Sequence, residues 1–183
     1  MKHKSYGFTV VELLIVIVII AILAAISILS YTGMQGKARD SARMQDLSNI
    51  QKALELYKVT NGNYPIAVGS PGMGGWEIST SGTFLSSLVT SGAVSKVPVD
   101  PKNTRTSSSG VPNRSSDWMY FYYRYASGDN GANPACGSYY VLGITRFDGV
   151  TAGSAHAQSP GFATLSRDWV STGAYVTGHY ANC

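Results

Sequence analysis

The chain has 183 residues, of which only 13% are charged, and its formal net charge at pH 7 is +4. This charge is too small to require an anionic partner, since Lys2 and Lys4 alone supply half of it. The abundance of Tyr, Gly and Ser fits an extracellular β-rich module better than a cytosolic enzyme.

A long apolar segment begins close to the N-terminus. From Phe8 to Leu29 it has 22 residues, of which only Thr9, Glu12 and Ser27 are polar. At about 1.5 Å per residue, a helix of this length covers the roughly 30 Å hydrocarbon core of a bilayer. We therefore predict that this segment forms a transmembrane helix.

Glu12 is the residue of this segment that two simple interpretations leave unexplained. A secretory signal peptide accounts for Lys2, Lys4 and the small residues at 25–27, but its apolar region is usually about 7 to 15 residues long. A plain single-pass anchor accounts for the length of the segment. In both cases the carboxylate makes insertion of the helix less favourable, and an ionisable group in a membrane helix normally has a partner or a function.

Gly7 and Phe8 follow a short basic leader, and Glu12 precedes the run LLIVIVIIAILAAI. This arrangement resembles the class III signal of type IV pilins and type II secretion pseudopilins. The resemblance covers residues 1–30 and continues to Pro65. It implies that residues 1–7 are a leader, that a prepilin peptidase cuts between Gly7 and Phe8, and that the new amino terminus of Phe8 is methylated.

The charges of the processed chain suggest how copies assemble. The basic leader holds the N-terminus of the precursor on the cytoplasmic side. Cleavage frees an amine on Phe8, whose ordinary pKa of about 8 makes it cationic, and Glu12 of a neighbouring subunit is a suitable counter-ion. In the resembling family this Glu recruits and aligns each incoming subunit. We therefore expect Phe8 and Glu12 to be the residues of filament assembly.

The resemblance implies a structural subunit of a type IV pilus-like filament that serves adhesion, motility or DNA uptake. Its partners are then further copies in a helical filament, the prepilin peptidase, and an inner-membrane assembly platform with its ATPase. The precursor is expected in the bacterial cytoplasmic membrane and the mature chain in an extracellular filament at the cell surface. One alternative is a pseudopilin of a type II secretion or competence pseudopilus. Another is a membrane-anchored extracytoplasmic binding domain that does not polymerise.

The helical pattern continues beyond the membrane segment. Leu47, Ile50, Leu54 and Tyr57 recur at the spacing of a helix face that packs on a sheet, and the opposite face is polar. We predict one helix over residues 8–60, amphipathic from residue 30 onward and ended by the sequence Asn-Gly-Asn-Tyr-Pro. The resemblance implies an α+β type IV pilin fold, in which this helix packs on a C-terminal antiparallel sheet.

Residues 61–117 are rich in Gly, Ser, Thr and Pro, and we predict that they connect the helix to the sheet. Within this region a short helix is expected around residues 83–90, where it buries Phe84, Leu85 and Leu88. A rigid extended turn is expected at Val97-Pro98-Val99-Asp100-Pro101, where the two prolines restrict the backbone.

The region 118–183 contains three segments rich in aromatic and β-branched residues. They predict the strands of an antiparallel meander at 118–126, 139–147 and 174–180. Alternation places Met119, Phe121, Tyr123 and Tyr125 on one face of the first strand, and Tyr140, Leu142 and Ile144 on one face of the second. We expect both sets to cover the stripe of the helix. Arg124 should then point to solvent and Arg146 should lie at the rim of the sheet.

Cys136 and Cys183 are the cysteines of the chain. In a bacterial chain exported to an oxidising compartment, they are expected to form a disulfide. The resemblance implies that such a bond bounds a C-terminal D-region. Metal binding is not expected, because two cysteines without CxxC spacing do not form a typical zinc site.

Signals for catalysis and for cofactors are lacking. His3, His156 and His179 have neither HExxH spacing nor the spacing of a nucleophile and its base. The Gly-rich residues 72–75 are not followed by the Lys-Ser or Lys-Thr of a phosphate loop, and we interpret them as a turn. We therefore predict a protein that is not an enzyme and has no cofactor.

Three further ligands or modifications remain open alternatives. The Asp-Gly turns at 129–131 and 147–149 offer oxygen ligands for calcium, although they lack the acid-rich loop of the major pseudopilins. Nucleic acid is a possible partner because aromatic residues and arginines can bind single strands, but the arginines are scattered along the sequence. Asn113-Arg114-Ser115 satisfies a glycosylation sequon.

Overall fold

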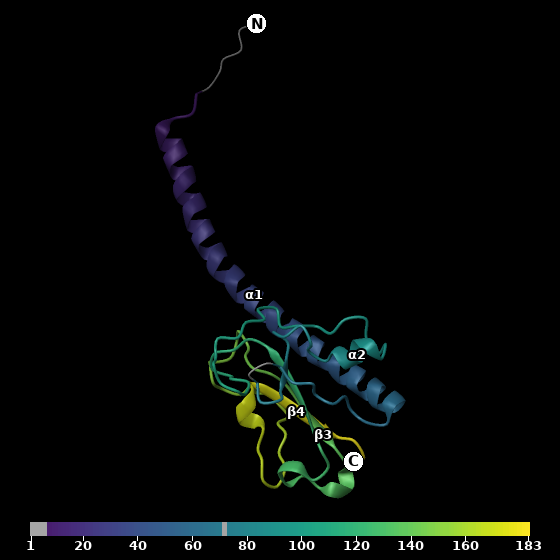
Figure 1. Cartoon of the computed structure of the whole chain (residues 1–183). Helices are drawn as coiled ribbons and strands as arrows, with labels where there is room; N and C mark the ends of the chain where they lie inside the picture. The colour runs from purple at the N-terminus through teal and green to yellow at the C-terminus, as the bar shows by residue number, and fades with distance from the viewer. Residues whose placement is uncertain (1–6, 71–72) are drawn as a thin grey trace. The chain divides into compact units, whose positions relative to one another are not determined.

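The computed structural model describes residues 7–70 and 73–183, without the side chains of residues 28–30 and 32. The leader residues 1–6 and Gly72 of the predicted turn lie outside the described residues. Figure 1 shows the described elements in chain order, and their bounds are α1 (Val10–Asn61), β1 (Glu77–Ile78), α2 (Ser86–Thr90), β2 (Tyr120–Tyr125), β3 (Tyr139–Ile144) and β4 (Tyr175–Tyr180). Single turns of 3-10 helix occur at Asp129–Gly131 (η1), Pro134–Cys136 (η2) and Val170–Thr172 (η3).

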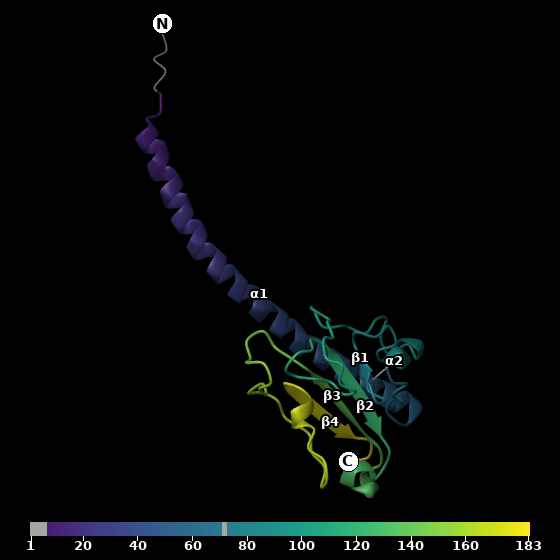
Figure 2. The same ribbon diagram turned by 60° about the vertical axis from the view of Figure 1, so that its left-hand side comes forward.

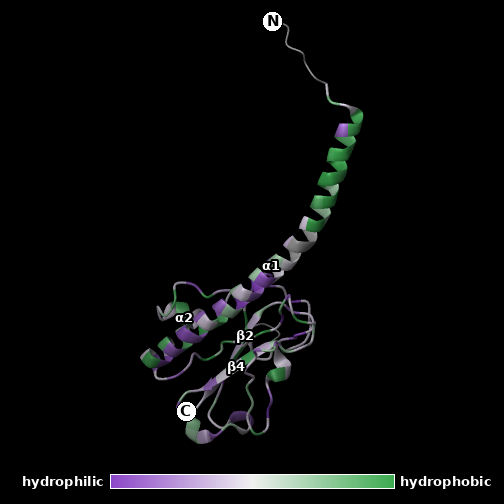
Figure 3. Ribbon diagram, turned by 180° about the vertical axis from the view of Figure 1, so that it is seen from behind, coloured by the Kyte–Doolittle hydropathy of each residue, from purple (hydrophilic) through white to green (hydrophobic). Residues whose placement is uncertain are grey.

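The chain divides into two units, of which the first ends at Ala38 and the second is Arg39–Cys183. The first unit contains the segment Val10–Ser27, which is long and apolar enough to cross a membrane and has none of its residues buried. In Figure 3 the ribbon of this part of α1 is coloured as hydrophobic along almost all of its length. A helix that is apolar on all sides is stable only where lipid or other apolar helices surround it.

In the second unit, α1 packs on one face of the sheet. Leu47, Ile50 and Leu54 are buried and Tyr57 is half-buried, so the predicted stripe is confirmed. The short α2 covers the same core through Leu88, and the preceding Phe84 and Leu85 are also buried, as predicted. The helix is shorter than expected, since it begins at Ser86.

The sheet is an antiparallel meander with the strand order β1-β2-β3-β4, as Figure 2 shows. The three predicted strands are present as β2, β3 and β4, and the α+β pilin-like fold is confirmed. β1 was not predicted, because its two residues are too few to show alternation. At the centre of the sheet, Gly143 of β3 pairs with Phe121, and a Cβ on Gly143 would lie 2.3 Å from the phenyl ring.

The prediction for the faces of β2 was wrong. Tyr120 and Tyr122 point to the helix, because they pair with Ile144 and Leu142 in a register that places all four on the same face. Met119 and Phe121 belong to a second core on the opposite face. Alternation could not distinguish the two faces of this strand, since both are apolar and both are covered.

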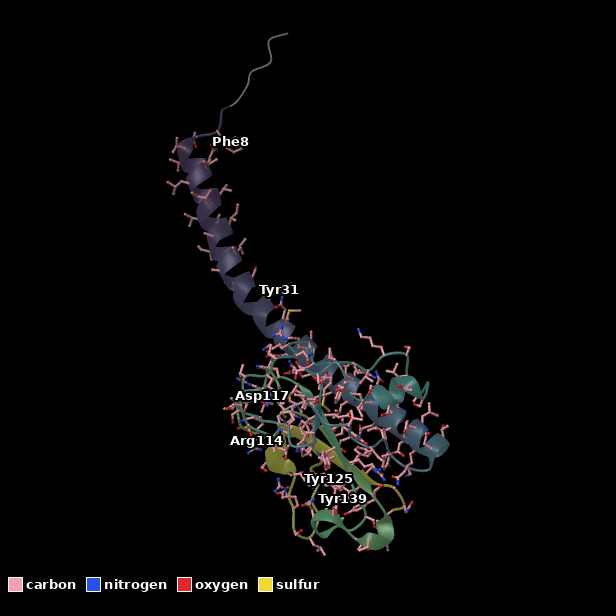
Figure 4. All side chains as sticks on the ribbon, viewed as in Figure 1. Phe8, Tyr31, Arg114, Asp117, Tyr125 and Tyr139 are labelled. Carbon is pink, nitrogen blue, oxygen red and sulfur yellow. A yellow bond between two sulfur atoms is a disulfide. The ribbon has the colours of Figure 1, made fainter. Side chains whose placement is uncertain are left out.

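The second core is mainly aromatic and is covered by the loops that connect the strands. The rings of Tyr125 and Tyr139, labelled in Figure 4, are stacked with their centroids 4.9 Å apart. Trp169 lies 4.6 Å from Tyr125 and is 2% exposed. Such ring pairs add about 0.5 to 1.5 kcal/mol each beyond the area that they bury.

Two arginines of the sheet region were expected to carry their charge to solvent. Arg124 pairs with Tyr140 and lies on the helix-facing side, where it is half-buried, so its predicted position on a solvent-facing side was wrong. Arg146 follows the end of β3, and its guanidinium lies 4.6 Å from the centroid of the Trp118 ring.

A buried ionic network joins α1 to the loops beside the sheet. The side chain of Arg43 is fully buried, and its Nε donates to Asp100 at 2.7 Å. The same guanidinium contacts Asp40 at 2.7 Å and Asp148 at 2.8 Å. Burial alone would raise the pKa of Asp148, but hydrogen bonds from Arg39, Lys102 and Arg43 outweigh it and hold that pKa well below its usual range.

Candidate functional site

The N-terminus of α1 is built as a capping box. Phe8 and Thr9 precede the first helical residue, Val10. The Thr9 Oγ1 accepts a hydrogen bond from the Glu12 amide at 3.2 Å. In return, the Glu12 Oε2 accepts from the Thr9 amide and from the Thr9 hydroxyl, both at 2.8 Å. These bonds satisfy N–H groups that have no partner within the helix.

This capping box was missed in the sequence analysis, although the sequence carries its signal. Thr9-Val10-Val11-Glu12 has the pattern of Ser or Thr followed three residues later by Glu, directly before an apolar run. The carboxylate therefore has a local role at the start of the helix, in addition to any role between chains. The two hydrogen bonds from Thr9 both end on the Oε2 atom of Glu12, so neither of them involves Oε1.

Gly7 and Phe8, the residues of the predicted cut, are exposed. A side chain at Gly7 would meet no described atom within 4 Å, so the described fold gives no reason for a glycine at this position. Phe8 is 85% exposed, and Figure 4 shows it at the start of the helix. Residues 7–9 precede the helix and are exposed, and the absence of a side chain at Gly7 lets the backbone approach another chain closely.

The apolar segment of the first unit, Val10–Ser27, places the chain in a class of proteins whose N-terminal helix needs an apolar environment. Glu12 is the one charged residue among Val10–Ser27. The Ser27 hydroxyl is satisfied within the helix, since it donates to the Leu23 carbonyl at 2.8 Å. Glu12 is therefore the one charged group of this segment that can bind a cationic partner.

Comparisons with known proteins agree with this class. Residues 2–28 match the family model of the prokaryotic N-terminal methylation motif. The type II secretion system core protein G of Escherichia coli (strain K12) is 30% identical over 99 residues, which cover 54% of this chain and 67% of that protein. The core protein G of Aeromonas hydrophila is 36% identical over 64 residues, which cover 35% of this chain and 45% of that protein.

A relative from another filament system is also similar. The type IV wide pilus major component PilA4 of Thermus thermophilus is 43% identical over 62 residues, which cover 34% of this chain and 47% of that protein. The chain thus spans less than half the length of PilA4 and of the Aeromonas protein. No solved structure matches it. On these matches and its fold, the chain belongs to the family of type IV pilins and type II secretion pseudopilins.

The predicted disulfide is confirmed and lies in the second unit. Cys136 is bonded to Cys183, with their Cα atoms 5.0 Å apart. It ties η2, which follows β2, to the end of the chain after β4. The bond therefore closes residues 136–183 into a loop, at the end of the sheet where β3 begins.

The positions considered for metal ions and catalysis have other partners. Among the described residues no group of three or more His, Cys, Asp or Glu side chains could hold a metal ion. Asp148 is engaged by Arg39, Arg43 and Lys102, and Asp129 accepts from the Ala126 amide at 3.0 Å. The His156 ring packs against the Phe147 ring in a tilted arrangement, with their centroids 4.5 Å apart.

The other two sequence signals lie in turns. The Asn113 Oδ1 of the glycosylation sequon accepts a hydrogen bond from the Ser115 amide at 2.8 Å, which closes a tight turn. Gly75 of the Gly-rich segment packs against Tyr123, whose ring would lie 2.8 Å from a Cβ at that position. The described part of this segment therefore serves packing.

Proposed function

We propose that this chain is a structural subunit of a type IV pilus-like filament. The observation that carries the proposal is the segment Val10–Ser27, an apolar helix with no buried residue and with Glu12 as its one charged residue. Other copies of the same helix offer such a surface an environment as apolar as lipid does. The segment can therefore serve first as a membrane anchor and then as the core of a fibre.

Polar groups select the partner in this proposal. Lipid tails are as apolar as leucine, so the hydrophobic effect does not favour helix association over lipid contact. Removal of the leader creates an amine on Phe8, and the Glu12 carboxylate of the neighbouring copy neutralises it. Breaking a buried ion pair by removing one partner typically costs about 3 to 5 kcal/mol, which is enough to decide between assembled and dispersed chains.

The capping box supports this role for Glu12. Thr9 holds the carboxylate at the positive end of the helix dipole, where negative charge is stabilised. Oε1 then remains for a partner amine. We propose that residues 1–7 are the leader, that residues 8–29 form the membrane and filament-core helix, and that residues 30–60, 61–117 and 118–183 are its continuation, the connecting region and the sheet with its D-region.

The remaining partners follow from membership of the family. A prepilin peptidase removes the leader and methylates Phe8, and an inner-membrane platform with its ATPase extracts the subunit. The precursor lies in the cytoplasmic membrane and the mature chain in a filament at the cell surface. The chain has no catalytic task in this proposal.

A pseudopilin is the second candidate, and the E. coli relative favours it. Core protein G is matched over 67% of its length. More than half of the matched residues of this chain lie beyond the N-terminal motif. The pilus component PilA4 is matched over 47% of its length, at the higher identity of 43%. The two candidates differ in whether long surface fibres or only short fibres within the envelope depend on the chain.

The replacement of Glu12 tests the proposal. In cells with the assembly machinery, Glu12→Ala should be cleaved after Gly7 and methylated as usual, as an intact mass of the purified protein can show. Fibres seen by electron microscopy should be lost. Ser27→Ala is the matched control, because it removes another polar group of the same helix and should leave fibres unchanged. Normal fibres from Glu12→Ala would refute the role of the carboxylate, and a chain that keeps residues 1–7 and stays dispersed would favour an anchored binding domain.

A further inference from the structure

The part of α1 that belongs to the second unit begins at Arg39 and runs along the sheet. Near its beginning, Asp46 accepts a hydrogen bond from the hydroxyl of Tyr120, the first residue of β2, at 2.8 Å. Shortly after its end, the hydroxyl of Tyr64 lies 3.4 Å from the carbonyl oxygen of Tyr180, the last residue of β4. β2 and β4 point the same way, as Figure 2 shows, since both are antiparallel to β3. Arg39 and the end of β4 therefore lie at opposite ends of the sheet.

Opposite pulls at these two ends slide the helix along the sheet instead of lifting it away. One pull acts on Arg39 from the N-terminal side, and the other acts on Cys183, which follows β4. Apolar packing has no preferred direction, so it resists such sliding weakly. A bidentate ion pair has a fixed geometry and is broken by a small displacement. Ion pairs near Arg39 are therefore the contacts that oppose this motion most strongly.

Two ion pairs of this kind bind the beginning of this helix part to two loops. The guanidinium of Arg39 donates to both oxygens of Asp148, from Nε at 3.1 Å and from Nη2 at 3.0 Å. Arg43 binds Asp100 in the same way, from Nε at 2.7 Å and from Nη2 at 3.2 Å. The ammonium of Lys102 also donates to Asp148, at 2.6 Å. Both loops are thus held to the helix by directional, charge-assisted bonds.

The two loops pass a pull directly to the central strands of the sheet. Asp148 follows the end of β3. Asp100 precedes Thr104, which forms a bridge with Trp118 just before β2 begins. β2 and β3 pair with each other along their whole lengths. A pull on the beginning of the helix is therefore shared by the central pair of strands and does not act on the apolar face of the helix alone.

We propose that the ion pairs of Arg39 and Arg43 form a mechanical clamp, which keeps the second unit closed on α1 when the chain is under tension. The inference rests on the proposed function, because in a fibre built on the apolar segments a pull on the second unit reaches the core through α1. The clamp differs from a contribution to stability at rest. The pair of Arg39 is 31% exposed on the arginine side and contributes little at equilibrium, yet it lies where the pull enters.

Pulling on single molecules of the full chain in detergent tests the clamp. One handle is attached at Gln35→Cys, an exposed position of α1, and the other to a tag after Cys183. The native cysteines are paired and do not react. At constant force, Arg39→Gln should raise the unfolding rate about fivefold or more, because forced unfolding follows the unfolding rate and the bidentate bond is lost. Its urea midpoint without force should stay close to that of the native chain.

A matched variant and a second direction of pulling separate the clamp from a general effect of lost charge. Lys52→Gln removes an exposed positive charge of the same helix that has no ion pair among the described residues, and it should leave the unfolding rate unchanged. A handle at Val59→Cys, which is 83% exposed, pulls on the other end of the helix. Because this pull does not enter at Arg39, Arg39→Gln should then unfold at the native rate.

Two results would overturn the clamp. One is an Arg39→Gln chain that unfolds at the native rate when it is pulled from residue 35, and the other is an equal rise in rate for both directions of pulling. The measurement uses dispersed chains, so either result leaves the proposed function standing. Native chains that form no fibre would instead overturn the proposed function and, with it, the tension that the clamp is assigned to withstand.

Discussion

The replacement Arg43→Leu should destabilise the second unit more than any other change to its ionic network. The guanidinium is fully buried and its removal leaves the Asp100 carboxylate, also 0% exposed, without a counter-ion. Asp40 and Asp148 are less affected, because Asp148 keeps Arg39 and Lys102 and Asp40 accepts from the amides of Asp148 and Gly149.

The magnitude follows from what remains around Asp100. Breaking a buried pair costs about 3 to 5 kcal/mol. The Asp100 Oδ1 still accepts from the Lys102 amide at 2.8 Å and the Asn103 amide at 3.3 Å, which places the expected loss near the lower end, at about 3 kcal/mol. A domain is stable by about 5 to 15 kcal/mol, so the loss is a large fraction. Arg39→Gln is the matched control, because Arg39 is 31% exposed and its pair should contribute about 0 to 1 kcal/mol.

Urea unfolding of the full chain in detergent, followed by Trp fluorescence, measures these differences. Arg43→Leu combined with Asp100→Asn should recover part of the loss, since the amide oxygen can still accept from the loop and no buried charge remains. A single variant within about 1 kcal/mol of the native chain, the value expected for an exposed pair, would refute the reasoning. So would a double variant that is no more stable than the single one.

Three further changes test other parts of the fold. The pKa of Asp148 is lowered in the folded chain, so the ionised carboxylate stabilises the fold above the unfolded pKa of about 3.9, and this stabilisation is lost as the pH falls. In Asp148→Asn the free energy of unfolding should therefore decrease less steeply as the pH is lowered. An unchanged dependence on acid pH would contradict the network. Gly143→Ala should destabilise by about 1 to 3 kcal/mol because its Cβ would lie 2.3 Å from the Phe121 ring, whereas Gly82→Ala, with no described neighbour within 4 Å, should be nearly neutral in the same urea assay. Cys136→Ser should cost about 2 to 5 kcal/mol by loss of the disulfide, and an equal melting temperature with and without reductant would show that the bond contributes nothing.

The elements of this fold could be predicted where their pattern was long. The stripe from Leu47 to Tyr57 and the aromatic strands gave the helix and β2 to β4, and the apolar N-terminal run with Glu12 gave the family. These signals need only local information, namely the 3.6-residue and 2-residue periods of the side chains. The pairing of Cys136 with Cys183 followed because the chain has no other cysteine.

The faces of β2 could not be predicted, because Tyr120 and Phe121 are both buried in apolar cores on opposite sides of the sheet. The partners of Arg43 were also hidden, since Asp100 and Asp148 are 57 and 105 residues away in the chain and no local pattern connects them. The capping box of Thr9 and Glu12 is a different case. Its signal, a Thr followed three residues later by a Glu before an apolar run, is local and could have been predicted from the sequence.

The central claim is that the amine of Phe8 neutralises the Glu12 carboxylate of another copy within a fibre of apolar helices. Electron cryomicroscopy of the native fibre, at a resolution that shows side chains, tests it most directly. We predict that the fibre begins each chain at Phe8 and places its nitrogen within about 4 Å of a Glu12 carboxylate of a neighbouring copy, the limit for an ion pair. Chains that still carry residues 1–7, or a Glu12 that faces water without an amine beside it, would contradict the account.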